Sequence, residues 1–340
     1  MQKPAVLDVT LRDGGCVLDF DFGSDNMEKI LAAEEAAGID VIELGYIDGE
    51  NGSASGRTMY SSEQVIRDAI LKSKKPGVTY VAMIDYGRYD FDRLTPRDPD
   101  GLDGIRLAFH KKDMENMIPL GRKVLDRGYM LFLQPMVTLR YSDSEIFRLI
   151  DLVNRYLPEA HALYVVDSFG EMQPQDVYRY LGMLDRNLVQ GPVIGLHSHN
   201  NIQLAYSNAQ AAIRYPSDRR IILDSSVNGM GKGAGNLSTE LLLGYLNRSQ
   251  GGHYETRPLL ELSDQVIKGL RGKYFWGYAP EYYLSSQYHC SPTYAAWFYK
   301  EKGLPIEKVE ALLDKISEEK RISFDREYAD ELYQKESGEK

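Results

Sequence analysis

The feature that most constrains the fold of this chain is a repeat of short apolar, β-branched runs, separated by stretches in which apolar residues recur at helical spacing. Eight runs occur, roughly 25 to 40 residues apart, at 5–10, 40–45, 78–84, 104–109, 129–134, 162–166, 193–197 and 220–224. Apolar runs that alternate with helices are typical of a buried parallel sheet built from βα units. Eight units predict an α/β fold, a closed (β/α)8 TIM barrel, which commonly needs about 250 residues.

The segments between the runs predict helices, and the last part of the chain predicts a different structure. Helical spacing covers 26–37, 62–72, 143–156, 175–184 and 203–213, and Ser62 and Asp143 are suited to cap two of these helices. A glycine-rich segment, 228–236, follows the eighth run and precedes a helical stretch through Leu246. From residue 255 onward helices occur without strands, including two charged ones at 306–319 and 325–335. We therefore expect a barrel domain over 1–254 and a helical C-terminal extension over 255–340.

Charge and composition argue against several classes of protein. The 340 residues carry a formal net charge of -10 and a pI near 5.2, so a broad basic surface for nucleic acid is not expected. No apolar run approaches the roughly 20 residues that span a bilayer, which predicts a cytoplasmic protein without a membrane partner. Only Cys16 and Cys290 are present, and neither lies in a CxxC pattern. A bound metal would therefore be held mainly by oxygen and nitrogen.

Two predicted strand ends carry residues suited to hold that metal. Arg12 and Asp13 follow the first run, although an ordinary ion pair would also explain this dipeptide. His197 and His199 end the seventh run, and alternate residues of a strand point to the same face, so both imidazoles can reach one ion. With Asp13 they would form a two-histidine, one-carboxylate site with open positions, suited to Mn²⁺, Mg²⁺, Fe²⁺, Co²⁺ or Zn²⁺. Asn236 in the glycine-rich segment is a candidate further oxygen ligand.

Polar side chains at the other predicted strand ends are candidates to surround this site. Active sites of barrel enzymes lie at the carboxyl ends of the strands, where several polar groups converge. The candidates are Glu43, His110, Gln134, Asp167 and Ser168. Among them, Glu43, Asp167 and Ser168 are better suited to bind a substrate by hydrogen bonds than to ligate the metal.

Four motifs, in order along the chain, give these residues a family resemblance. They are DVTLRDGG at 8–15, VDS at 166–168 with Gly170 and Met172 after it, HSHNN at 197–201 and GMGKGAGN at 229–236. Together they resemble the HMG-CoA lyase-like metallolyases, the DRE-TIM superfamily, and within it the 4-hydroxy-2-oxovalerate aldolases. The match runs over nearly the whole chain, and each motif stands at the expected strand of a (β/α)8 barrel.

This resemblance implies a function and assigns roles to individual residues. It implies that Asp13, His197 and His199 hold a divalent cation, with Mn²⁺ or Mg²⁺ preferred over Co²⁺ or Zn²⁺, while Arg12 stabilises an enolate oxyanion. Segment 277–282 resembles the one that carries the catalytic tyrosine of the aldolases, here Tyr282. The implied reaction cleaves a 4-hydroxy-2-oxo acid through a pyruvate-type enolate and releases an aldehyde. The family also suggests a homodimer and an aldehyde dehydrogenase as partners.

One departure from the aldolase pattern leaves the general base open. The aldolases carry a histidine two residues beyond Arg-Asp-Gly, and this chain has Cys16 there. A thiol could act as the base if a nearby cation lowered its pKa from about 8.5. His110 or His289 could instead act from another loop.

Two other functions stay open beside the aldolase. An acyl-CoA condensing enzyme of the isopropylmalate or citramalate synthase type would use the same metal and arginine, but those enzymes usually carry Glu or Gln where this chain has Gly15. The Cys16 substitution also fits a barrel that binds metal and 2-oxo acid without turnover.

Overall fold

A computed structural model describes residues 3–52 and 56–337, and in it a closed sheet of eight parallel strands forms the core. The barrel strands are β1 (Ala5–Asp8), β2 (Val41–Ile47), β4 (Thr79–Asp85), β5 (Gly104–Phe109), β6 (Met130–Pro135), β7 (Ala162–Asp167), β8 (Val193–Ser198) and β9 (Ile221–Ser225). Their order is β1-β9-β8-β7-β6-β5-β4-β2, and pairing of β1 with β2 closes the barrel. The predicted TIM barrel and all eight predicted strands are confirmed.

A short additional strand, β3 (Met59–Tyr60), lies outside the closed ring and pairs in parallel with the end of β2. Tyr46 is in register with Met59, and Ile47 with Tyr60. Two residues are too few to show a strand period, so β3 could not be predicted from the sequence. This pairing, together with that of Tyr46 with Met83 of β4, extends β2 beyond Gly45, where the predicted strand ended.

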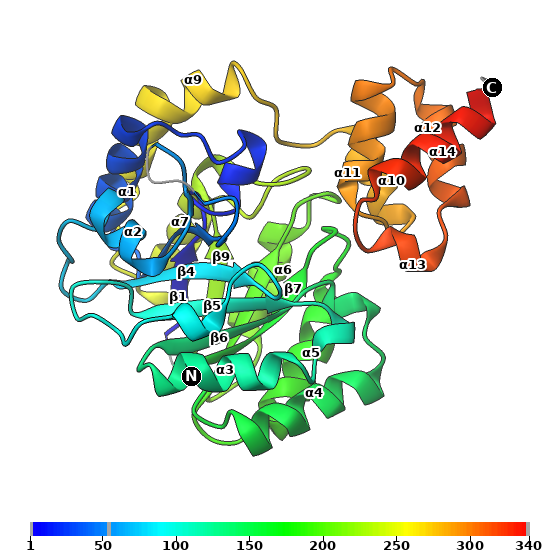
Figure 1. The fold of residues 1–340 in the computed structure, drawn as a ribbon. Coiled ribbons are helices and arrows are strands. Elements are labelled where there is room, and N and C mark those ends of the chain that lie inside the picture. The colour runs from blue at the N-terminus through cyan, green and yellow to red at the C-terminus, as the bar shows by residue number, and fades with distance from the viewer. Residues whose placement is uncertain (1–2, 53–55, 338–340) are drawn as a thin grey trace.

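Helices follow most of the barrel strands and cover the outside of the sheet (Figure 1). They are α1 (Ser24–Ala37), α2 (Glu63–Ala69), α3 (Met117–Asp126), α4 (Asp143–Tyr156), α5 (Pro174–Asn187), α6 (Ala205–Arg214) and α7 (Thr239–Gln250). Ser62 caps α2 as predicted, because its hydroxyl accepts from the Val65 N–H. The cap of α4 is Ser142, one residue before the predicted Asp143, because Ser142 and Glu145 form a reciprocal capping box. Helix α3 was not predicted.

Two apolar layers hold the barrel together, one on each face of the sheet. Alternate strand residues, including Leu7, Val81 and Phe132, pack inside the barrel. The residues between them, such as Val6 and Ile105, pack outward against the helices in a much larger cluster. Both faces are therefore buried, which explains the continuous apolar runs of the sequence.

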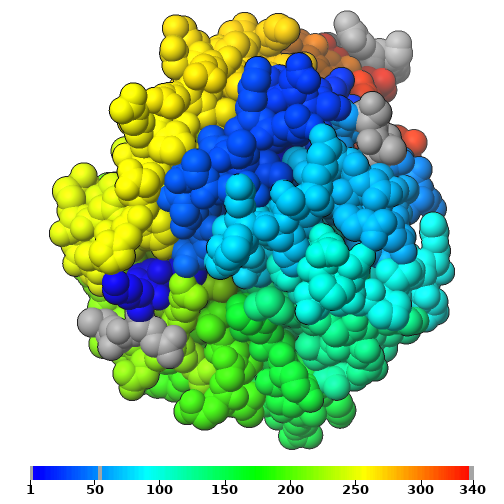
Figure 2. All heavy atoms as spheres, turned by 90° about the vertical axis from the view of Figure 1, so that its left-hand side faces the viewer, coloured from blue at the N-terminus to red at the C-terminus, as the bar shows by residue number. Residues whose placement is uncertain are grey.

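The first helices after the barrel belong to this outer layer. They are α8 (Arg257–Leu262), a π-helical turn at Ser263–Ile267 and α9 (Lys268–Arg271). Leu259, Ile267 and Trp276 join the large cluster that surrounds the barrel. Figure 2 shows this yellow segment lying along the blue N-terminal part of the chain. The predicted division at 254/255 marks where strands end and only helices follow. The helices pack on the barrel as far as Trp276, and only the later ones form a separate apolar cluster.

The last helices form a separate unit beside the barrel (Figure 1). They are α10 (Pro280–Gln287), α11 (Pro292–Ala296), α12 (Ile306–Lys315), α13 (Glu318–Arg321) and α14 (Arg326–Ser337). This unit, called the tail below, has its own apolar cluster, which includes Tyr294, Phe298 and Leu312. Among the described residues no helix is long and apolar enough to cross a membrane.

Candidate active site

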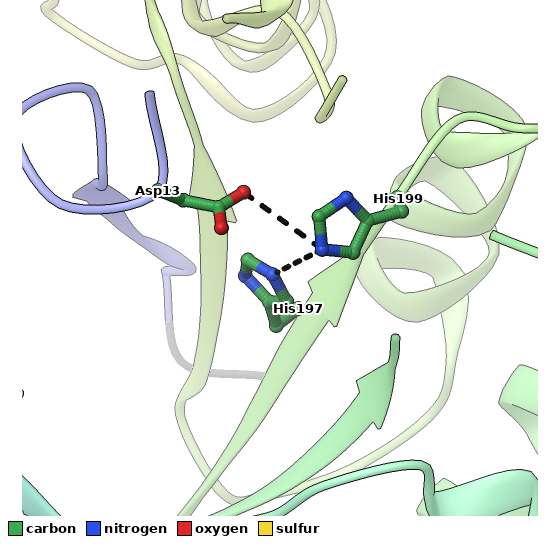
Figure 3. Close-up of side chains that lie close together, drawn as sticks. All are labelled: Asp13, His197 and His199. Carbon is green, nitrogen blue, oxygen red and sulfur yellow. Dashed lines mark hydrogen bonds and ion pairs between the residues drawn. The ribbon is translucent and has the colours of Figure 1, made fainter. Parts of the chain in front are cut away.

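Three side chains converge at the carboxyl end of the barrel (Figure 3). Asp13 lies in the turn after β1, while His197 and His199 lie on and just beyond β8. His199 Nε2 is 3.3 Å from His197 Nε2 and 3.8 Å from Asp13 Oδ2. All three side chains are buried, and one ligand atom from each lies within 4.8 Å of the other two. The structure thus brings together the three predicted metal ligands.

A carboxylate behind the site fixes the orientation of His197. Asp224, on β9, has its Oδ2 atom 3.0 Å from His197 Nδ1. A hydrogen bond there places the proton on Nδ1 and leaves the lone pair of Nε2 facing His199 and Asp13. Metal-binding histidines are commonly oriented in this way. Asp224 is itself held by an ion pair with Arg106.

Arg106 continues this arrangement as a buried chain of alternating charges. Glu43 Oε2 accepts from Arg106 Nη1 at 2.7 Å and from Arg12 Nε at 2.7 Å. Arg12 Nη1 then donates to Asp13 Oδ1 at 3.0 Å. Glu43 is fully buried and does not line the cavity described below. Its position supports a role in holding Arg12 rather than the substrate contact expected from the sequence.

The protonation states of Asp13 and His199 suit a cation. Burial would raise the pKa of Asp13, but Arg12 and the two histidines lower it well below its usual range. Burial lowers the pKa of His199 to about 4, against the opposing effect of Asp13. An ionised carboxylate and neutral imidazoles are the forms that bind metal. The residues present therefore fit a divalent cation.

Asn236 supports Asp13 from the glycine-rich loop. Its Nδ2 atom donates to Asp13 Oδ2 at 2.6 Å and to the Met230 carbonyl at 3.0 Å. A Cβ atom at Gly231 would lie 2.3 Å from Asn236 Nδ2 and 2.7 Å from Asp13 Oδ2, so only glycine fits there. Asn236 thus orients the carboxylate through its amide nitrogen, and its metal-ligand role remains a prediction.

The three residues line a cavity of about 210 Å³ between the barrel and the tail. Polar barrel residues in its wall include Arg12, Gln134, Ser168 and Lys232, and the tail contributes Ser291, Pro292 and Ile322. Ser168 is thus placed where the sequence predicted it.

Asp167 faces away from this cavity. Its carboxylate accepts from the backbone N–H groups of Glu171 and Met172, at 2.9 and 3.1 Å. Burial raises its pKa to about 7. These bonds shape the loop after β7, so the geometry does not support substrate binding by Asp167.

None of the three candidate bases from the sequence fits that role here. Cys16 lies at the cavity wall, with its Sγ atom 4.0 Å from Asp13 Oδ1, and its side chain is exposed. Removal of neighbouring water by the protein, together with the Asp13 charge, raises the pKa of the thiol to about 12. This is the opposite of the shift that a thiol base needs. His110 and His289 line a neighbouring cavity instead.

The position of Tyr282 also differs from the expectation. It is buried on α10 against Ala234 and Ala279, and its hydroxyl accepts from Lys300 Nζ at 3.0 Å. It is not among the residues that line the cavity. The tail thus packs this ring against the glycine-rich loop and Lys300, and the role of Tyr282 as a proton donor stays a prediction.

Three titratable residues of the cavity wall were not selected as site candidates from the sequence. They are Tyr46, Asp85 and Lys232. Asp85 is the residue directly after the predicted strand 78–84, so the same strand-end rule that selected Glu43 could have found it. Tyr46 had no such signal, because β2 continues past its predicted end.

Comparison with known proteins agrees with this geometry. Residues 110–266 match the family model described as HMGL-like. A 4-hydroxy-2-oxovalerate aldolase of Geobacillus genomosp. 3 is 30% identical over 253 residues, which cover 73% of this chain and 71% of the aldolase. The chain belongs to the HMGL-like family.

Two other matches are a sequence relative of lower identity and a solved structure with the same fold. An oxaloacetate decarboxylase of Mycobacterium tuberculosis is 26% identical over 275 residues, covering 80% of this chain and 78% of that protein. The carboxyl transferase domain of Rhizobium etli pyruvate carboxylase with pyruvate shares the fold, with a TM-score of 0.75 at 15% identity. That match covers 99% of this chain and 61% of the other. The metallolyase resemblance seen in the sequence is confirmed.

Proposed function

We propose that this HMGL-like protein is a divalent-metal-dependent aldolase that cleaves a 4-hydroxy-2-oxo acid through a pyruvate-type enolate. The observation that carries the proposal is the convergence of Asp13, His197 and His199 beside Arg12 in one cavity. The similarity to 4-hydroxy-2-oxovalerate aldolases supports the same reaction class. The aldehyde product would pass to solvent or to a partner such as an aldehyde dehydrogenase.

Asp13, His197 and His199 would hold the cation, with Asn236 as a candidate fourth ligand. When bound, the cation supplies Lewis acidity toward the 2-oxo acid. Two imidazoles and one carboxylate suit Mn²⁺ and Mg²⁺ as well as Co²⁺ and Zn²⁺, and we favour the first two.

Arg12 has the fixed charge that an enolate oxygen requires. Its guanidinium is held by Glu43 and Asp13 and lines the same cavity as the three ligands. Donors that are already oriented stabilise developing negative charge without reorganisation. Ser168 and Lys232 line the cavity as well and could bind the substrate carboxylate.

A condensing enzyme fits this cavity less well. The Glu or Gln of that group would replace Gly15, where an added Cβ atom would lie 2.5 Å from Phe20 Cδ1. A decarboxylase acting on a 2-oxo diacid is the second candidate, because a relative named oxaloacetate decarboxylase covers most of the chain. It would form the same enolate, and supplying oxaloacetate or an aldehyde with pyruvate distinguishes the two.

The first experiment follows exchange of the pyruvate methyl protons in deuterated water by NMR, with Mn²⁺ or Mg²⁺ present. We expect metal-dependent exchange that falls about a thousandfold in Asp13→Ala and His199→Ala, since a Lewis acid contributes several kcal/mol. Asp126→Ala, an exposed position on α3, is the matched control and should exchange like the wild type. Absence of exchange in metal-loaded wild-type protein would contradict the proposal.

A further inference from the structure

Two cavities next to the candidate metal ligands share part of their wall. The smaller holds Asp13, His197 and His199, and the larger, of about 520 Å³, lies over the ends of β2 and β4. Cys16, Tyr46 and Asp85 line both cavities, and no other described residue does so. A substrate with its 2-oxo acid end at the ligands would extend past these three side chains into the larger cavity.

The surroundings of Asp85 leave its carboxylate available. Asp85 ends β4, where its backbone is in register with Ala108 of β5 and its carbonyl accepts from the Arg88 N–H at 3.0 Å. The side chain is half-buried, and its Oδ1 atom is buried without a hydrogen-bond partner among the described residues. A buried carboxylate oxygen without a donor is costly, so a hydrogen-bond donor on a bound substrate would stabilise this oxygen. The sheet thus holds the backbone of Asp85 in place, while its Oδ1 atom can still accept a hydrogen bond.

The charges around Asp85 suit a group that gains and loses a proton. Burial and Glu43 raise its pKa to about 6, against Arg12, Arg88 and Lys232, which lower it. A general acid–base group is most effective when its pKa lies near the working pH. The two other residues that line both cavities are poor candidates, because the surrounding protein and the Asp13 charge raise the pKa of Cys16, and burial raises the pKa of Tyr46.

We propose that Asp85 is the acid–base residue of the aldol reaction, in place of the histidine that Cys16 replaces. This rests on the proposed function. In cleavage, the Asp85 carboxylate takes the proton of the C4 hydroxyl. The C3–C4 bond breaks, its electron pair forms the enolate beside Arg12, and the C4 oxygen becomes the aldehyde carbonyl. Asp85 then returns the proton to C3, giving pyruvate and regenerating the carboxylate.

In the reverse direction the same carboxylate removes a methyl proton from pyruvate, so the exchange reaction tests Asp85 without any aldehyde. We expect Asp85→Asn to slow metal-dependent exchange by about a hundredfold or more, the usual contribution of a general base. Asp85→Glu should recover part of the rate, and Asp92→Asn, an exposed residue of the loop after β4, should exchange like the wild type.

Two further measurements separate catalysis from structure. Mn²⁺ affinity of Asp85→Asn, measured by calorimetry, should stay within about threefold of the wild type, since Asp85 is not a proposed ligand. The wild-type rate should rise with pH as Asp85 ionises, and the Asn variant should lack this rise. Exchange near the wild-type rate in Asp85→Asn, or loss of Mn²⁺ together with exchange, would overturn the role of Asp85. No exchange by the wild type would instead count against the proposed function.

Discussion

The barrel and the tail contribute to the same cavity in different ways. The barrel places Arg12, Asp13, Glu43, Arg106 and Asp224 in one buried network that ends at the candidate metal ligands. The tail contributes only neutral side chains to the wall, from the start of α11 and from the segment after α13. The charged groups of the cavity wall therefore all come from the barrel, whereas the tail covers one side of the cavity with neutral residues.

A physical reason for this division lies in the strands. Eight strands are hydrogen-bonded into a closed ring, so the backbone positions at their carboxyl ends are fixed relative to one another. Buried charges need such fixed partners, because a buried charge without a partner is costly. The tail is joined to the barrel through apolar contacts of Ala234 with Tyr282 and through side-chain contacts such as the ion pair of His289 with Glu171.

The largest expected effect tests the barrel half of this comparison. Arg106→Ala removes the one guanidinium that pairs with both Glu43 and Asp224, so each of these buried carboxylates loses its ion pair with Arg106. We expect the free energy of unfolding to fall by about 3–5 kcal/mol, measured by urea denaturation. Arg122→Ala, which breaks exposed ion pairs on α3, should cost only about 1 kcal/mol or less. Equal losses in the two variants would contradict the special role of the buried network.

A smaller effect is expected on the affinity for metal. Asp224→Asn keeps the shape of the side chain but removes the charge that orients His197 through Nδ1. We expect Mn²⁺ to bind about 10–100-fold more weakly, as titration calorimetry would measure. Asp151→Asn, at an exposed position on α4, serves as the control. Unchanged Mn²⁺ affinity would mean that the orientation of the His197 imidazole does not depend on the Asp224 charge.

The smallest effect tests the tail. Tyr282→Phe removes the hydrogen bond to Lys300, which should lower stability by about 1 kcal/mol. Pyruvate exchange should stay within about threefold of the wild type, because Tyr282 does not line the cavity. If exchange fell a hundredfold while metal affinity was retained, the tail would supply a catalytic group, and the division between barrel and tail would be wrong.

The sequence alone determined the barrel and the positions of the candidate metal ligands. Strand period and apolar runs are local signals, and they placed every barrel strand to within a few residues. The strand-end rule then placed Asp13, His197, His199 and Ser168 at one rim, where the structure shows them. These residues follow from the pattern because the ring of strands fixes where each strand ends.

Only the tertiary structure decided which other groups lie close to the candidate metal ligands. Glu43 and Asp167 stand at strand ends like the residues of the wall, yet one is held by two arginines and the other by backbone N–H groups. Tyr282 lies on a helix whose placement depends on packing over the whole tail. Asp85 became a candidate because its buried Oδ1 atom has no hydrogen-bond partner among the described residues, and because it lines two adjoining cavities. Such features depend on side chains that are distant in sequence, so no local pattern encodes them.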